Sequence, residues 1–472
     1  MSKEVSIAEK IVAFSIFAIA LLLVVAIGFA HVAFPERLAS VGLLQTGGLR
    51  SASRGSIYAN GELLASGVNE RIYPLGANVS HLVGYYNSDH LLPVGAEYVL
   101  SETLEGDGIG WQTNVLNYFN PFPETGNDVE LTIDLALQER AVKLIGERRG
   151  AIFAFDPTTG AVKVHVSSPS FDPNELAGGA AALIRHADLL NGAGGPLTDR
   201  VTASVYPPAS VFKIITASAL IEGGATSSSS YASPSYIVFE DGRTRLSNFN
   251  GAPCGDGHVT LAEAFARSCN TTFALASDDI TADALTGQAA KWGFGHEFSY
   301  LGKTFQSVPP SSDDGDVMRL SAIGQHDIRV TPFHMALVAA AVANEGVVNF
   351  PHIVKHVQDS YGFPVTVNEE RTSEVWVRPE ITDELKQMMV DAVEKEYGTA
   401  HKVYGRPGAV AMKTGTGESG GPEQPQVAWA VGFAPVETPK YAFAVLIEGD
   451  DKEPYPLGGR DAAVIAASLF AE

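Results

Sequence analysis

Three short strings, found in this order along the chain, carry the side chains that a serine acyl-transfer site needs. A serine hydroxyl becomes a good nucleophile only beside a base, and a lysine can be that base if its pKa is lowered. Each string alone is weak, because such short patterns arise by chance. Together they are a strong signal. They read Ser210-Val211-Phe212-Lys213, Ser268-Cys269-Asn270 and Lys413-Thr414-Gly415-Thr416.

The first string predicts the nucleophile and its base. Two prolines stand shortly before Ser210, and the almost wholly apolar stretch 211–221 runs up to a pair of glycines. This pattern predicts a buried helix with Ser210 in its first turn, where the helix dipole favours an alkoxide. Lys213 lies one turn later on the same face. Burial and a second cation, for which Lys413 is the candidate, are expected to lower its pKa.

The other two strings predict contacts with a substrate. In an extended or turning loop, side chains two positions apart point the same way, so Ser268 and Asn270 would both face the cleft. Ser268 could relay a proton to a leaving amine and Asn270 could bind a substrate amide, although this tripeptide could equally be a helix C-cap. Residues 409–416 predict a strand whose edge could pair with an extended peptide. There Lys413 supplies charge for a terminal carboxylate, and Gly415 allows another chain to come close.

Composition excludes several other classes of function. The formal net charge is −22, with no block rich in Lys and Arg, which argues against nucleic acid as a partner. No zinc-type spacing, phosphate loop or nucleotide fingerprint is present, so we predict no metal and no cofactor. The two cysteines, Cys254 and Cys269, stand fifteen positions apart. They are either small buried apolar side chains, the simpler interpretation, or a disulfide that braces the loop leading to Ser268.

Residues 11–33 predict a membrane anchor. They include no Asp, Glu, Lys or Arg, and about 20 apolar residues suffice to cross a hydrocarbon core about 30 Å thick. The alternative is a cleaved signal peptide, for which the apolar run is long. We expect residues 1–10 to be a cytoplasmic tail on a single-pass protein of the cell membrane, with the catalytic domain outside the cytoplasm.

The rest of the chain divides near residue 128. Residues 34–128 are punctuated by Gly, Asn and Pro and predict a small, strand-poor module. Strands at both ends of residues 129–472, with helices between them, indicate an α+β domain. The clearest elements there are helices at 134–148, at 382–397 and after 461, and hairpins at 151–166 and 427–448.

The stretch 129–472 resembles the transpeptidase domain of class B penicillin-binding proteins, most closely the actinobacterial penicillin-binding protein A type. The three strings correspond to the S-x-x-K, S-x-N and K-T-G motifs of such proteins. Residues 54–57 and 61–65 resemble the N-terminal pedestal of the family, and 81–85 a segment near it. Further segments that look like the family are 131–134, 156–160, 168–174, 322–325, 330–332, 344–346 and 429–435.

This resemblance implies a five-stranded antiparallel sheet between helices, as in penicillin-binding proteins and serine β-lactamases, with an N-terminal pedestal and one transmembrane helix. It implies peptidoglycan D,D-transpeptidation, in which Ser210 attacks the D-Ala–D-Ala bond of one stem peptide and an amine of a neighbouring stem peptide releases the acyl group. Lys213 would be the base and Ser268 the proton relay. β-Lactam antibiotics would acylate Ser210 and leave slowly. The residues implied to bind substrate are Asn270, Lys413, Thr414, Gly415 and Thr416.

Two residues depart from the family pattern. Ala209 stands where the family usually has Gly, and a positive φ there would strain it. Val211 replaces a Thr that often follows the nucleophile. Neither change removes a reactive group, so both bear on rate and drug affinity more than on activity. The module before residue 129 is too short for a glycosyltransferase domain, and family precedent implies a separate polytopic membrane glycan polymerase as partner.

Three other functions are alternatives to this one. A class D-like β-lactamase would turn over a cephalosporin quickly, but an anchor and pedestal suit it poorly. A D,D-carboxypeptidase would use water in place of the amine acceptor. A catalytically idle cell-wall scaffold would not need Ser210, Lys213, Ser268 and Lys413 intact.

Overall fold

The computed structural model describes residues 54–67, 71–87, 91–108, 126–310, 314–366, 372–417 and 426–471, together with Leu22, Thr113 and Leu116. The membrane anchor predicted at 11–33 lies outside these residues, apart from Leu22. In the described ranges, no helix is both long enough and apolar enough to cross a membrane.

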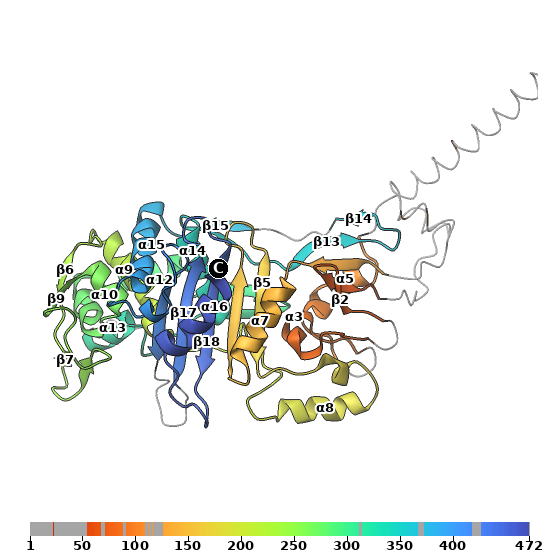
Figure 1. The fold of residues 1–472 in the computed structure, drawn as a ribbon, viewed down its shortest axis with the longest axis horizontal. Coiled ribbons are helices and arrows are strands. Elements are labelled where there is room, and N and C mark those ends of the chain that lie inside the picture. The colour runs from red at the N-terminus through yellow and green to blue at the C-terminus, as the bar shows by residue number, and fades with distance from the viewer. Residues whose placement is uncertain are drawn as a thin grey trace, which may run out of the picture.

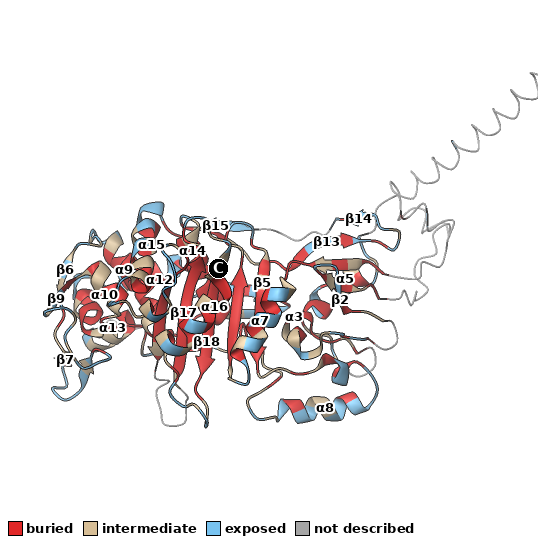
Figure 2. Ribbon diagram, viewed as in Figure 1, coloured by how far each residue is buried: buried red, intermediate tan, exposed pale blue. Residues whose placement is uncertain are grey.

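A five-stranded sheet forms the centre of the larger domain (Figure 1), with the strand order β16-β17-β18-β4-β5 and every neighbouring pair antiparallel. Both predicted hairpins are present, and strand β18 of one pairs with β4 of the other. Nearly all residues of the sheet are buried, as Figure 2 shows, so both faces must be covered. The strands are β4 (Gly150–Phe155), β5 (Val162–Ser168), β16 (Ala411–Gly417), β17 (Val427–Ala434) and β18 (Tyr441–Glu448).

Alternate residues of the strands enter two separate cores, because neighbouring side chains of a strand point to opposite faces. On β17, Trp429 packs in the core that contains α14 (Pro332–Ala343), whereas Ala430 packs in the core beneath α7 (Leu135–Ile145) and α16 (Ala463–Phe470). Helix α14 is buried over almost its whole length and contacts β4, β17 and β18. The α+β layering expected from the sequence is therefore present.

The predicted helices exist, with shifted ends. Helix α7 begins after Asp134, whose carboxylate accepts a hydrogen bond from the backbone N–H of Leu137 at 3.0 Å. Helix α15 (Pro379–Glu394) begins three residues before the expected start at 382, because proline fits the first helical position. The closing helix, α16, is preceded by the π-helical turn η6 (Gly458–Ala462).

The N-terminal module is built on a second five-stranded sheet, of order β14-β13-β3-β1-β2, at one end of the molecule (Figure 1). The described part of residues 34–128 is itself poor in strands, as expected, but the sheet is completed by β3 and by two strands from a segment more than two hundred residues later. The strands are β1 (Ile57–Ala59), β2 (Glu62–Ala65), β3 (Asp128–Leu131), β13 (Val354–Gln358) and β14 (Pro364–Val365). Its short helices are η1 (Gly76–Asn78), α3 (Ser80–Val83), α4 (Ala96–Val99) and α5 (Ser101–Leu104).

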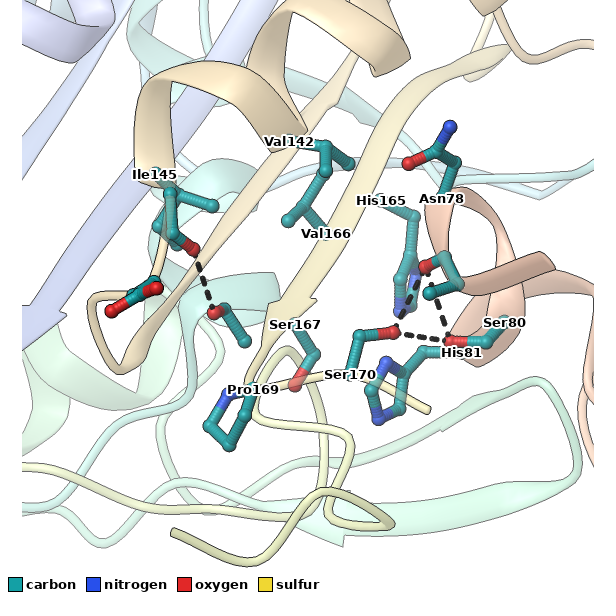
Figure 3. Close-up of a pocket in the computed structure, with 14 residues that line it drawn as sticks. Asn78, Ser80, His81, Val142, Ile145, His165, Val166, Ser167, Pro169 and Ser170 are labelled. Carbon is teal, nitrogen blue, oxygen red and sulfur yellow. Dashed lines mark hydrogen bonds between the residues drawn. The ribbon is translucent and has the colours of Figure 1, made fainter. Parts of the chain in front are cut away.

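The seam between this module and the larger domain contains a hollow of about 270 Å³, shown in Figure 3. Hydrogen bonds cross the seam: Ser80 Oγ and Ser170 Oγ are 2.6 Å apart, and the amide of Gln138 donates to the carbonyl oxygen of Asn78 at 2.8 Å. No residue of the three strings lines the hollow. These bonds tie the module to α7 and to the segment that follows β5.

The remaining elements lie outside the two sheets. In Figure 1, α8 (Ala181–Leu190) is drawn below the N-terminal module, whereas α13 (Gly315–Ala322) and the short strands β6 (Ser230–Ala232), β7 (Tyr236–Val238) and β9 (His258–Thr260) belong to the lobe at the opposite end. The other helices are η2 (Pro173–Leu176), η4 (Ser277–Asp279) and α12 (Ala282–Lys291). The other strands are β8 (Arg245–Ser247), β10 (Glu297–Tyr300), β11 (Lys303–Gln306), β12 (Val347–Asn349) and β15 (Ser373–Val375).

Candidate active site

Ser210 lies in a short 3-10 turn, η3 (Ala209–Phe212), that leads into α9 (Lys213–Glu222). The sequence predicted one continuous helix, so this start is tighter than expected. Ala209 has a φ of +50°, the strained conformation considered above for an alanine at this position. Its N–H donates to the carbonyl oxygen of Gly324 at 2.9 Å, and a Cβ on Gly324 would lie 2.0 Å from the carbonyl oxygen of Ala209. Close packing against Gly324 therefore holds the turn that presents Ser210.

Lys213 is wholly buried at the start of α9, and its Nζ contacts Ser210 as expected. Its Nζ lies 3.1 Å from Ser210 Oγ, 2.7 Å from Asn270 Oδ1, 2.9 Å from the Ser268 carbonyl oxygen and 3.3 Å from Ser268 Oγ. Burial, with the nearby charge of Lys413, holds the pKa of Lys213 well below its ordinary value of 10.5. A lysine in this state can be neutral and accept a proton from Ser210.

The second string joins two short helices. Ser268 is the C-cap of α10 (Leu261–Arg267) and has a φ of +61°, and Cys269 is the N-cap of α11 (Asn270–Ala276). The sequence left open whether this tripeptide caps a helix or faces the cleft, and it does both. The sharp reversal at Ser268 turns its side chain, together with that of Asn270, toward Lys213.

Cys254 and Cys269 form a disulfide, with their Cα atoms 6.3 Å apart. The simpler interpretation of the two cysteines as unlinked apolar side chains is therefore wrong. The bond links Cys269, which is buried between Ser268 and Asn270, to the loop after β8 that forms one wall of the cleft. The end of β8, where that loop begins, is further held by a hydrogen bond from Asn270 Nδ2 to the Ser247 carbonyl oxygen at 3.1 Å.

The third string is the edge strand β16, beside β17. Lys413 is fully buried, and its Nζ donates to Ser268 Oγ and to the Thr414 carbonyl oxygen, each at 2.9 Å. Burial lowers the pKa of Lys413 to about 7. A Cβ on Gly415 would lie 3.2 Å from the Pro208 carbonyl oxygen and the Val211 N–H nitrogen, so the chain that comes close to this glycine is the turn carrying Ser210.

A cleft of about 400 Å³ lies over these groups. Of the eight site residues predicted from the sequence, six line it and the two lysines lie buried beside it, hydrogen-bonded to the lining serines. The lining members are Ser210, Ser268, Asn270, Thr414, Gly415 and Thr416.

Other residues of the cleft escaped the sequence analysis. Thr399 Oγ1 accepts a hydrogen bond from Thr414 Oγ1 at 2.7 Å, and Phe249 lines the cleft with 80% of its surface exposed. Lys402 and Arg460 also line the cleft. All four lie in loops or short turns whose local sequence carries no pattern, so no signal could have identified them. Among the described residues, no group of three or more His, Cys, Asp or Glu side chains could hold a metal ion.

Known proteins resemble this chain in sequence and in fold. The profile of the penicillin binding protein transpeptidase domain matches residues 150–471. Peptidoglycan D,D-transpeptidase PbpA of Mycolicibacterium smegmatis is 32% identical over 444 residues, which cover 89% of each chain. Peptidoglycan D,D-transpeptidase MrdA of Escherichia coli is 26% identical over 453 residues, which cover 82% of this chain and 69% of MrdA.

A solved structure agrees with this likeness. The penicillin G acyl-enzyme complex of penicillin-binding protein A from M. tuberculosis is 30% identical, with a TM-score of 0.79, and the match covers 89% of this chain and 98% of that chain. Both the sequence and the whole described fold therefore point to one group of proteins. This chain belongs to the penicillin-binding protein transpeptidase family, as a class B protein of the PbpA type.

Proposed function

We propose that this protein is a peptidoglycan D,D-transpeptidase that works through an acyl-enzyme on Ser210. One observation carries the assignment of the nucleophile: Nζ of the buried Lys213 lies 3.1 Å from Ser210 Oγ, in a setting that lowers the lysine pKa. A base of this kind is what a serine needs to attack a peptide bond near neutral pH.

Acylation begins when neutral Lys213 takes the hydroxyl proton of Ser210. The Oγ then attacks the carbonyl carbon of the penultimate D-Ala of a stem peptide, and the new C–O bond forms. As the peptide C–N bond breaks, the leaving nitrogen receives a proton from Lys213 through the hydroxyl of Ser268, whose Oγ is 3.3 Å from Lys213 Nζ. D-Ala departs, and Lys213 is neutral again.

Transfer runs the same steps in reverse with a different amine. The neutral amine of a neighbouring stem peptide attacks the carbonyl carbon of the Ser210 ester. Its proton passes through Ser268 to Lys213 and on to Ser210 Oγ as the ester C–O bond breaks. A new amide bond links the two stem peptides, and the enzyme regains its starting state.

Substrate binding falls to the residues around these groups. The positive charge of Lys413 and the hydroxyl groups of Thr414 and Thr416 hold the carboxylate of the terminal D-Ala. Asn270 binds an amide of the stem peptide, which lies along the free edge of β16 beside Gly415. A β-lactam follows the same path to Ser210, but its leaving nitrogen stays tethered to the acyl group and hinders the incoming amine.

We also propose that this protein is a membrane protein that crosses the cell membrane once. Residues 11–33 are the anchor, 1–10 the cytoplasmic tail, 34–128 the pedestal and 129–472 the transpeptidase domain outside the cytoplasm. The disulfide between Cys254 and Cys269 supports an oxidising compartment for that domain. A polytopic membrane glycan polymerase is the proposed partner, because the cross-linking reaction acts on stem peptides that are carried by glycan strands.

Gel labelling with a fluorescent penicillin tests the nucleophile. Wild-type protein should be labelled in a one-to-one ratio and Ser210→Ala should not be labelled at all. Equal labelling of both proteins would refute the assignment of Ser210. Release of D-Ala from a stem pentapeptide, with and without an amine acceptor, then separates a transpeptidase from a D,D-carboxypeptidase, and fast turnover of a chromogenic cephalosporin would indicate a β-lactamase instead.

A further inference from the structure

The cleft over Ser210 has an unusual charge for this chain. The protein carries a formal net charge of −22, yet the described residues that line the cleft include no Asp or Glu. They do include three cationic side chains outside the three strings, namely Arg267, Lys402 and Arg460. A cationic wall in an acidic protein indicates a site for an anionic ligand.

Two of these three cations already have carboxylate partners. Arg267 Nε lies 2.7 Å from Glu263 Oε1, and Arg460 Nη2 lies 2.8 Å from Asp461 Oδ2. Lys402 is exposed, and within the described part of the chain its Nζ makes no hydrogen bond or ion pair. Of these three described cations, Lys402 is therefore the one whose charge is not already paired with a carboxylate and is available to a ligand.

The backbone that carries Lys402 is well anchored. Lys402 is the middle residue of the 3-10 turn η5 (His401–Val403). Just before the turn, the N–H of Thr399 donates to the carbonyl oxygen of Ala266, in α10, at 3.0 Å, and Thr399 Oγ1 accepts a hydrogen bond from Thr414 Oγ1 of the third string at 2.7 Å. The segment that leads into the turn is thus bonded to α10, which ends at the second string, and to the third string, and Lys402 lines the same cleft as Thr414.

Microscopic reversibility says which part of the substrate arrives beside Thr414. The amine that leaves in acylation and the amine that attacks in transfer form or break a bond to the same carbonyl carbon, so they occupy the same position. The leaving D-Ala is bound through its carboxylate by Lys413, Thr414 and Thr416. The acceptor residue must then take over this position, in the cleft that Lys402 also lines.

We propose that Lys402 is a specificity residue for the acceptor, and that it binds a carboxylate on the incoming stem peptide in addition to the one next to the attacking amine. This inference rests on the proposed function of the cleft. The donor peptide leaves the D-Ala position of the cleft empty once D-Ala has departed. The charge of Lys402 therefore acts on the transfer step and not on acylation of Ser210.

Two free D-amino acids that differ only in charge provide the test. D-Glutamate and D-glutamine have the same shape and both carry an α-amine with an adjacent carboxylate, but only D-glutamate has a second carboxylate. The acyl-enzyme is formed from an N-acyl-D-alanine thioester, and mass spectrometry measures how it partitions between water and each amino acid. The wild-type protein should favour D-glutamate about two- to fivefold, the range of an exposed ion pair.

Three variants separate Lys402 from general charge effects. In Lys402→Gln the two amino acids should be used equally, and in Lys402→Arg the preference for D-glutamate should persist. Lys395→Gln removes the same charge from an exposed position that does not line the cleft, and it should keep the wild-type preference.

Each other outcome contradicts the proposal. If Lys402→Gln keeps the wild-type preference, Lys402 does not bind the acceptor. If Lys395→Gln loses as much of the preference for D-glutamate as Lys402→Gln, the preference comes from the overall charge of the protein. If penicillin acylates Lys402→Gln much more slowly, Lys402 acts on the donor. Failure of the proposed function itself is visible separately, because Ser210→Ala would then still be labelled by penicillin.

Discussion

The repulsion between the two buried lysines offers the sharpest test of the catalytic assignment. Lys213 must be neutral to accept the proton of Ser210, and the charge on Lys413 helps to keep it so. Below about pH 7, Lys413 is protonated. Removing that charge in Lys413→Gln should therefore raise the pKa of Lys213. The acylation rate rises with pH as Lys213 loses its proton, and this rise, the acidic limb of the pH profile, should move to higher pH.

The structure sets the size of this shift. Both Nζ atoms contact the hydroxyl of Ser268, at 3.3 Å for Lys213 and 2.9 Å for Lys413, so they are at most about 6.2 Å apart, the two distances laid end to end. At that separation two unit charges repel by about 2.7 kcal/mol in a medium with an effective dielectric constant of about 20. This energy corresponds to a pKa change of about 2 units.

The assay is the second-order rate constant for acylation by a fluorescent penicillin, measured from about pH 5 to about pH 9. Lys413→Gln should move the midpoint of the acidic limb to a pH about 2 units higher. This shift comes in addition to any loss of rate that results from weaker binding of the carboxylate. Thr414→Val is the matched control, since it removes a polar group from the same strand without changing charge and should leave the midpoint in place. A midpoint that stays or falls in Lys413→Gln would refute the proposed coupling of Lys413 to the base.

Three further changes have expected outcomes. The pKa of Lys413 is about 7 in the folded protein, against an ordinary value of 10.5. Burying its charge therefore lowers the stability of the fold most below pH 7, and less as the pH rises toward 10.5. Lys413→Met should raise the free energy of unfolding by about 1–4 kcal/mol at neutral pH, as measured by denaturant titration. Gly324→Ala places a Cβ 2.0 Å from the Ala209 carbonyl oxygen and should slow penicillin acylation at least about tenfold, because the turn bearing Ser210 must shift. Cys254→Ser opens a disulfide whose cysteines stand fifteen positions apart and should lower stability by about 3 kcal/mol in the chain-entropy model, so an unchanged melting temperature would contradict a bracing role.

Much of the chemistry and the local structure could be read from the sequence. The types of the reactive side chains are visible in the strings around Ser210, Ser268 and Lys413, and the hairpins and α7 follow from alternation and capping, which depend only on near neighbours. The positions of helix ends were less certain. Helix α15 begins at Pro379 and not at 382, because the first helical position favours proline while the apolar pattern alone does not mark an end.

Only the tertiary structure decided what comes together over long separations. Lys413 reaches Ser268 because the edge strand β16 packs against the turn that carries Ser210, and Gly415 is the residue that allows this close approach. Only the fold also shows the Cys254 disulfide, the late strands β13 and β14 of the N-terminal sheet, and the presence of Lys402 in the same cleft as Thr414. The physical reason is the same for all of them. Periodicity and caps report contacts within a few residues, whereas contacts between distant segments depend on how complete layers pack, and no local pattern records that.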